Sequence, residues 1–305
     1  MTRHIALAVA LALAAPAFAA TDLSANVELD TGTQNIKSTN TKGSYQAGRI
    51  EANLTGRVEG NGGFIAGKAS AILGRTGSAS TDDAWVQIGT AAFDVKLGRF
   101  EATDLYPTPA DAARIGGLYG TNALRGRFSD NRAHAAATFN LGTGVALELG
   151  LVDVKDVGAA GGAKGVRPVL SYGAGPLSLK LGLESGKTDD GTAEASFSGA
   201  GAAVAYAVNS GLTLRAQVSS GTDKLAAGDV KKHASLVGVS AGGLNLSVES
   251  GKTGTTKYSG AFGGYTFGLF DIKGASMTPS FGTQSVDTGS KVTDSKFAIR
   301  VNYTF

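Results

Sequence analysis

The chain has 305 residues, of which 45 are glycine, 6 are proline and none is cysteine, and only 17% are charged. Glycine is about twice as frequent as in an average globular protein, which favours strands and turns over helices. The glycines follow no collagen-like period, a hydrophobic content of 42% with a net charge of +3 excludes a disordered chain, and the lack of cysteine excludes disulfide scaffolds and cysteine-based metal sites.

The N-terminus has the three parts of a secretory signal peptide. Arg3 and His4 form a charged start, an apolar run follows from Ile5 to Ala15, and residues 16–19 (PAFA) provide an A-x-A cleavage site. The apolar run is shorter than the ~20 residues of a membrane-spanning helix, so a spanning helix is the weaker alternative. We therefore predict a signal peptide at residues 1–19 and one domain at residues 20–305. Export together with the mild charge argues against a nucleic-acid partner.

From Leu23 onward, apolar and polar residues alternate with a period of two. This pattern indicates strands with one apolar and one polar face. The alternating segments include residues 23–30, 49–59, 177–184, 212–219, 244–249 and 297–305. The segment at 49–59 is longer than the five or six residues of an average strand.

Short turns and longer polar loops alternate between these segments. The short turns are expected at 61–63, 90–92, 141–143, 174–176, 209–211, 241–243 and 271–273. The longer loops are expected near 31–47, 76–82, 103–122, 154–165, 187–194, 220–231, 252–257 and 286–294. Fifteen connectors imply about sixteen strands with both chain ends on the short-turn side, which is typical of a transmembrane antiparallel β-barrel of the outer membrane.

Two segments near the middle and the end of the chain refine this picture. Residues 123–140 change parity, and we predict one strand with a bulge near Asp130 rather than two strands. At the C-terminus, five apolar residues alternate from Phe297 to Phe305, which suits a closing strand with aromatic side chains at the membrane interface. Trp85 and Tyr258 fall near predicted strand ends and are candidates for an aromatic girdle, although the parity of Trp85 points it inward.

Residues 83–89 (DAWVQIG) and 93–100 (FDVKLGRF) resemble a hairpin of the Gram-negative trimeric general porins, especially the betaproteobacterial type. Gln87 and Asp94 stand where that pattern has glycines. The resemblance implies a sixteen-stranded trimeric diffusion pore whose third loop, here about residues 101–122, folds inward and narrows the channel. It also implies recognition of Phe305 by the barrel-assembly machinery, contact with outer-membrane lipid and location in the outer membrane of a Gram-negative bacterium.

If the polar faces line the lumen, inward bases slightly outnumber inward acids, which suggests a weak anion preference. A basic wall opposite an acidic third loop would create a transverse field that screens solutes by charge. The expected pore-lining and constriction residues are Arg49, Arg57, Lys96, Arg99, Glu101, Asp104, Asp111, Arg114, Arg125 and Arg127.

Other functions have weaker support in the sequence. His134 and His233 have no nearby nucleophile motif, so we expect no enzyme activity, no catalytic residue, and neither a cofactor nor a metal. The sequence leaves open a barrel that acts mainly as a surface adhesin or structural anchor, and a secreted soluble β-sandwich. The predicted function is passive diffusion of ions and small hydrophilic solutes through an outer-membrane porin.

Overall fold

The computed structural model describes residues 20–108, 111–116, 118, 120–127, 133–155, 162–189 and 193–305. The signal peptide predicted at 1–19 lies outside this range, as does the predicted bulge near Asp130. No helix in the described ranges has the length and apolar character needed to cross a membrane.

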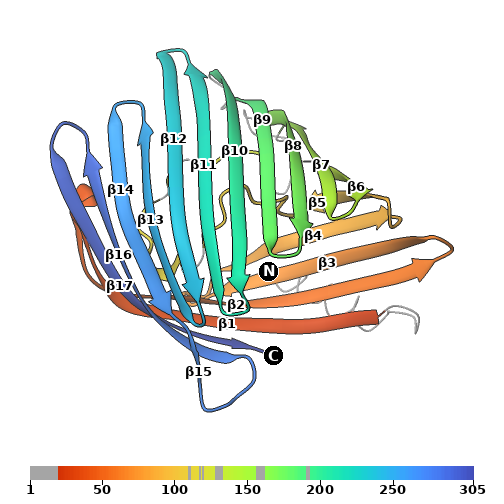
Figure 1. Ribbon diagram of the computed structural model, residues 1–305, viewed down its shortest axis with the longest axis horizontal. Coiled ribbons are helices and arrows are strands. Elements are labelled where there is room, and N and C mark those ends of the chain that lie inside the picture. Colours follow the sequence, from red (N-terminus) through yellow and green to blue (C-terminus); the bar gives the residue numbers. More distant parts are fainter. Residues whose placement is uncertain are drawn as a thin grey trace.

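The described chain is built almost entirely of strands (Figure 1). In chain order they are β1 (Ala20–Ile36), β2 (Thr41–Gly60), β3 (Gly63–Gly74), β4 (Ala79–Gly89), β5 (Phe93–Arg99), β6 (His134–Gly142), β7 (Val145–Lys155), β8 (Gly162–Ala174), β9 (Leu177–Asp189), β10 (Glu194–Asn209), β11 (Leu212–Leu225), β12 (Gly228–Ala241), β13 (Leu244–Thr253), β14 (Thr256–Tyr265), β15 (Phe267–Gly268), β16 (Ala275–Asp287) and β17 (Lys291–Thr304). Two short 3₁₀ turns are η1 (Lys37–Thr39) and η2 (Asp111–Ala113).

These strands form one closed antiparallel sheet. Apart from β14 and β15, each strand pairs with the next along the chain, and β1 also pairs with β17, from Asn26 opposite Thr304 to Asn35 opposite Ser295. The two-residue β15 continues β14, because both pair with β16. Counting β14 and β15 as one strand gives a sixteen-stranded barrel, which confirms the predicted fold class. A single closed sheet also excludes the two-sheet β-sandwich.

Each of the fifteen predicted connectors overlaps a connection between consecutive strands, but several loops are shorter than expected. The connector between β1 and β2 is only residues 37–40, and the one between β11 and β12 is only residues 226–227. The strands continue pairing almost to their ends, with Ile36 opposite Thr41 and Leu225 opposite Gly228. Polar strand extensions account for the rest of the predicted loops.

Alternation places apolar side chains on the outer face and polar side chains on the inner face. On β9, Leu181 and Leu183 are exposed, whereas the alternate residues Gly182 and Glu184 are buried. Exposed large apolar side chains recur on the other strands, and a surface of this kind is not stable in water. The outer face is therefore suited to contact with lipid.

Most exposed aromatic side chains of the described chain lie near the short-turn end of the barrel, whereas Phe281 and Phe297 lie midway along β16 and β17. Exposed aromatic side chains there are Phe93, Phe139, Tyr206, Tyr265, Phe267, Phe270, Tyr303 and Phe305. The prediction that Trp85 and Tyr258 belong to this girdle is wrong. Trp85 packs against buried Phe100, and Tyr258 packs against a buried cluster that includes Leu236, because both have the inward parity of their strands.

The barrel topology predicts which connectors face the outside of a cell. Four single cysteine variants test this. Thr39→Cys and Ala227→Cys lie in connectors at the loop end, and Asn61→Cys and Ser210→Cys lie in short turns. An impermeant maleimide should label the first two variants on intact cells and spare the other two. The chain has no cysteine of its own, so background labelling is absent. Equal labelling of both pairs would contradict this orientation.

Candidate functional site

The connector between β5 and β6, which we call the third loop, runs from Phe100 to Ala133 and begins as a narrow neck. Glu101 and Gly126 form a bridge between its outgoing and returning arms. The Ala102 N–H donates to the carbonyl of Arg125 at 2.7 Å, and the Arg127 N–H donates to the carbonyl of Phe100 at 2.8 Å.

Arg125 and Arg127 therefore belong to the third loop. The prediction that residues 123–140 form one bulged strand is wrong, because β6 begins only at His134. Gly126 and Arg127 both have positive φ, +122° and +57°, which interrupts strand geometry at this point. The two arginines that were expected on a wall strand instead lie on the loop itself.

The described parts of the loop lie against the inner face of the wall. Leu105 is fully buried over Gly182 of β9, where an added Cβ would lie 2.3 Å from Leu105 Cδ1. Thr121 donates its hydroxyl to the carbonyl of Ala200 on β10 at 2.8 Å. Figure 1 shows this yellow segment behind β10 to β12, within the ring of strands.

The same loop reaches strands farther along the ring. Arg114 pairs with Glu249 of β13 at 2.7 Å. On β16, an added Cβ at Gly282 would lie 2.0 Å from the carbonyl oxygen of Ala113, so only glycine lets the loop lie so close to the wall. The loop therefore contacts an arc of wall from β7 to β16.

Arg167 on β8 holds the middle of the loop to the wall. Only 1% of this residue is exposed, and its Nη2 donates to the carbonyl of Thr103 at 2.7 Å and to Asn122 Oδ1 at 2.9 Å. Its guanidinium also lies 3.7 Å from Glu148 Oε1 and 3.9 Å from Glu184 Oε2. One buried cation thus links both arms of the loop to two carboxylates of the wall.

The two carboxylates also accept hydrogen bonds from the loop backbone. The N–H of Thr103 donates to Glu148 at 3.0 Å. The N–H groups of Ala123 and Leu124 each donate to Glu184 at 3.2 Å. The wall therefore satisfies backbone groups that would otherwise be buried without a partner.

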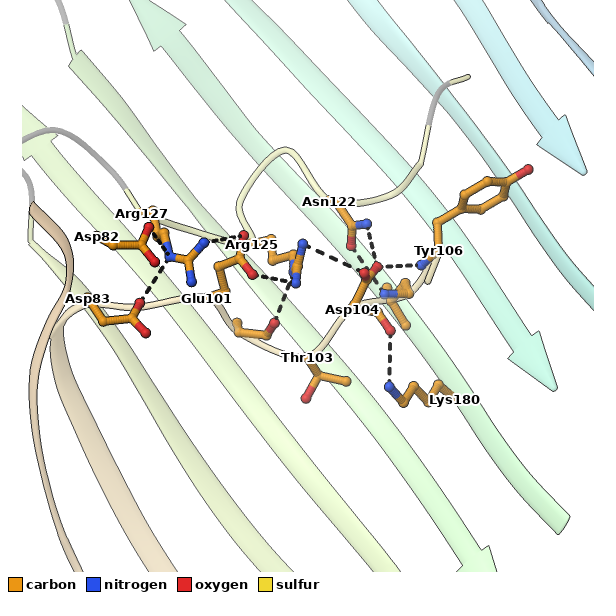
Figure 2. Close-up of polar contacts among 12 residues, drawn as sticks. Asp82, Asp83, Glu101, Thr103, Asp104, Tyr106, Asn122, Arg125, Arg127 and Lys180 are labelled. Atoms are coloured by element: carbon orange, nitrogen blue, oxygen red, sulfur yellow. Dashed lines mark hydrogen bonds and ion pairs between the residues drawn. The ribbon is translucent and has the colours of Figure 1, made fainter. Parts of the chain in front are cut away.

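Arg127 lies among three acids at the neck of the loop (Figure 2). Its Nε is 3.2 Å from Asp82 Oδ1 and 3.0 Å from Asp83 Oδ1, and its Nη1 is 3.3 Å from Glu101 Oε1. The register between β3 and β4 shifts here, and the Asp83 N–H donates to Ser70 Oγ at 2.7 Å. This bulge brings two consecutive aspartates to one arginine, which strict alternation forbids.

Arg125 continues the network from Glu101 to Asp104, which lies next to β9 (Figure 2). Its Nη2 is 2.6 Å from Glu101 Oε2 and its Nη1 is 3.6 Å from Asp104 Oδ2. Asp104 also accepts a hydrogen bond from Asn122 at 2.8 Å, while its backbone carbonyl accepts one from Lys180 of β9 at 3.3 Å. The neck carries alternating charges rather than acids alone.

The surroundings of the loop raise the pKa values of two of its residues. Burial alone would lower the pKa of Arg127, but its hydrogen bond to Asp83 and the charges of Asp83, Glu101 and Asp82 outweigh burial and raise that pKa. Burial raises the pKa of Tyr106, and the charge of Glu249 acts in the same direction. Both groups keep their ordinary charge state at neutral pH.

The remaining predicted site residues lie on the wall or at the edge of the described loop. Arg49 and Arg57 have the inward parity of β2 and lie near Glu51 and Glu59, at 3.7 Å and 2.6 Å. Their side chains keep roughly half of their surface exposed. Asp111 begins η2, and nothing is described of its side chain.

Lys96 and Arg99 lie on β5 at the foot of the loop. Lys96 Nζ lies over the rings of Trp85 and Phe100, at 4.6 Å and 5.4 Å from their centroids. Gly98 has a φ of +117°, and beyond it Arg99 donates to the carbonyl of Arg127 at 2.6 Å. Arg99 thus turns toward the loop, because the positive φ of Gly98 interrupts the alternation of β5.

Several residues of this site were not among those predicted. Asp82 and Asp83 were placed at a loop boundary, and Thr103 and Asn122 carry no charge that would single them out. Arg167 has the inward parity of β8, but its link to the loop depends on contacts between residues far apart in sequence.

Comparison with solved structures finds the same architecture in several outer-membrane proteins. An anion-selective porin from Comamonas acidovorans superposes with a TM-score of 0.75 at 15% identity, over 94% of this chain and 100% of that chain. The trimer form of OmpT of Vibrio cholerae gives 0.71 at 12% identity, over 94% and 99%. A variant of the Rh. blastica porin gives 0.61 at 15% identity, over 93% and 100%.

The chain therefore has the fold of the general porins, a closed antiparallel barrel of sixteen strands. At these identities the likeness shows the fold alone. No family model and no curated protein matches the chain by sequence.

The buried position of Arg167 predicts a large cost for its removal. Arg167→Met leaves Glu148 and Glu184 without their shared cation, and breaking a buried pair in this way costs about 3–5 kcal/mol. We expect a lower urea midpoint for unfolding in detergent micelles and faster trypsin cleavage within the third loop. Lys187→Met, which breaks an exposed pair with Glu194, should cost at most about 1 kcal/mol. Equal losses for the two variants would contradict the anchoring role.

Proposed function

We propose that this protein forms a water-filled channel in the outer membrane of a Gram-negative bacterium for passive diffusion of ions and small hydrophilic solutes. The observation that carries the proposal is a closed barrel with an apolar outer face, a charged inner face and a charged loop against that inner face. Such a channel needs no catalytic group. His134 stacks on Phe100 inside the barrel with ring centroids 4.0 Å apart, whereas His233 has the outward parity of β12. The two histidines therefore do not lie together in one site.

The constriction of this channel is proposed to lie at the third loop. The loop residues Glu101, Asp104, Arg114, Arg125 and Arg127 would face permeating solutes together with wall residues. The wall residues of the proposed set are Arg49, Arg57, Lys96 and Arg99, and Asp111 completes it. Support comes from the contacts of the loop with β8, β9, β10, β13 and β16, which hold it against the inner wall.

We also propose a weak anion preference. Within the described chain, the inward bases Lys96, Lys180 and Arg215 form no ion pair, whereas the acids around the loop each have a cationic partner. Unpaired positive charge on a narrow inner surface raises the local concentration of anions. The Comamonas acidovorans porin of the same fold is anion-selective, which is consistent with this proposal.

The alternative of a surface adhesin or structural anchor has less support. Three of the connectors at the loop end, those following β11, β13 and β16, contain only residues 226–227, 254–255 and 288–290. Such short connectors provide little surface for binding a partner protein.

Charge substitution in the loop neck tests the channel and its constriction together. Arg125→Gln with Arg127→Gln removes two positive charges, and the reversal potential in a salt gradient should shift toward cations. Each charge is worth about 1 kcal/mol at 4 Å in bulk water and more in a narrow pore, so a several-fold change in the permeability ratio is expected at low salt.

Glu101→Gln with Asp104→Asn is the matched control of opposite sign. It should shift the reversal potential toward anions, and both shifts should shrink at 1 M salt, where the Debye length is about 3 Å. Arg300→Gln, on the wall beside Asp30, should change selectivity less. A protein without channel conductance would refute the proposed function, and unchanged selectivity in both double variants would remove the loop neck from the constriction.

We propose that the barrel is a homotrimer and that the barrel-assembly machinery recognises its C-terminus. OmpT, which has the same fold, is described in a trimer form. Phe305 ends the closing strand, and its backbone exchanges hydrogen bonds with Ala25 at 3.0 Å and 2.8 Å. Its ring stacks on that of Tyr303.

Deletion of Phe305 tests the role of the C-terminus in assembly. It should lower the amount of heat-modifiable trimer in the outer membrane severalfold. Phe305→Tyr keeps an aromatic end and should retain most of it. Normal trimer levels after the deletion would contradict the proposed recognition.

A further inference from the structure

Three basic side chains lie in a row on the outer face of the barrel near its loop end. His233 of β12 lies directly opposite Lys252 of β13, and Lys252 lies opposite Lys257 of β14. They share the parity of Val237 and Val248, which are 53% and 52% exposed on the outer face. The row therefore faces away from the channel.

This arrangement is unfavourable without an anion. Like charges directly opposite each other on a sheet destabilise it. In the described part of the chain, none of the three forms an ion pair within 4.0 Å, although Asp287 of β16 is the register partner of Lys257. Both lysine ammonium groups are therefore available to an external anion.

A second basic pair on the outer face shows the contrast. Lys164 of β8 lies opposite Lys187 of β9. Here, however, Lys187 forms an ion pair with Glu194 at 2.5 Å, and Lys164 lies opposite Asp153 on β7. Lys164 and Lys257 each lie opposite one aspartate, so the contrast lies in the other lysine: Lys187 forms an ion pair with Glu194, whereas Lys252 forms none with any described residue.

A groove of about 500 Å³ lies on the same outer face, directly on the membrane side of the row. Its first tier consists of hydroxyl groups, Ser235, Ser250, Ser259 and Ser285, and its second tier consists of Val237, Val248, Ala261 and Thr283. Ser235 and Ser250 hydrogen-bond to each other at 2.9 Å. Apolar side chains, hydroxyl groups and basic groups thus follow one another toward the loop end.

We propose that this surface binds a lipid with a phosphate headgroup in the membrane leaflet on the loop side. The phosphate lies between Lys252 and Lys257 with His233 as a further donor, and an acyl chain lies in the groove over Ala261. The order of the tiers matches the change from hydrocarbon to headgroup in a bilayer, and charge complementarity selects an anionic headgroup. The inference rests on the proposed function, because it requires the outer face to lie in lipid.

Binding of defined lipids to the detergent-solubilised protein tests this site. Native mass spectrometry would count bound dimyristoyl phosphatidic acid on the wild type, on Lys252→Gln with Lys257→Gln, and on the control Lys164→Gln with Lys187→Gln. The first double variant should bind at least about tenfold more weakly, since each lysine near an anionic headgroup strengthens binding severalfold. The control should stay within about twofold of the wild type, because Lys187 is already paired with Glu194.

Two further probes identify the source of the phosphate. Dimyristoyl phosphatidylcholine should bind equally to the wild type and to the first double variant. Millimolar inorganic phosphate should not displace phosphatidic acid from the wild type. The proposal is overturned by equal binding to the wild type and the first variant, by an equal loss in the control, or by displacement with inorganic phosphate. Channel conductance is measured on the same samples and should not change, so a failure of the proposed channel is seen separately.

Discussion

Closure of the sheet by backbone hydrogen bonds is the constraint on which the other features depend. Hydrocarbon offers no partner to a backbone N–H or C=O, so a spanning sheet must have no free edge. The pairing of β1 with β17 removes both edges, and the exchange between Ala25 and Phe305 extends it to the last residue. Once the ring is closed, the parity of each residue decides whether it meets lipid or the channel.

The inner face supports the third loop through both shape and charge. Gly182 and Gly282 leave room for the loop chain. Arg167 donates a hydrogen bond to the backbone carbonyl of Thr103 in the loop. The charges at the neck are largely paired, as in the contacts of Arg127 with Asp82 and Asp83. The inner charges therefore fix the position of the loop in addition to acting on solutes. This explains why an exported barrel carries buried ion pairs despite their desolvation cost.

Local alternation in the sequence predicted the barrel, and the prediction failed where long-range pairing interrupts that alternation. Connector positions and the two faces of each strand depend on the period of two, so both could be predicted. The return of residues 123–127 to Glu101 could not, because the alternation there resembles a strand until the bridge to Gly126 is known. The inward aspartates beside Ser70 depend on a bulge set by the partner strand. For Trp85 two signals in the sequence conflicted. Its parity indicated the inner face, which is where it lies, whereas its residue type suggested the membrane interface.

The two rims of the outer face differ in chemistry, and this difference has a mechanical consequence. Aromatic rings such as Tyr206 and Tyr303 mark the short-turn rim, while serines, threonines and lysines on strand extensions mark the opposite rim. Rigid rings prefer one depth in a bilayer, whereas long amines can reach headgroups over a range of depths. A change in bilayer thickness should therefore be absorbed at the lysine rim while the aromatic rim keeps its depth. The barrel would behave as a cylinder anchored at one end and adjustable at the other.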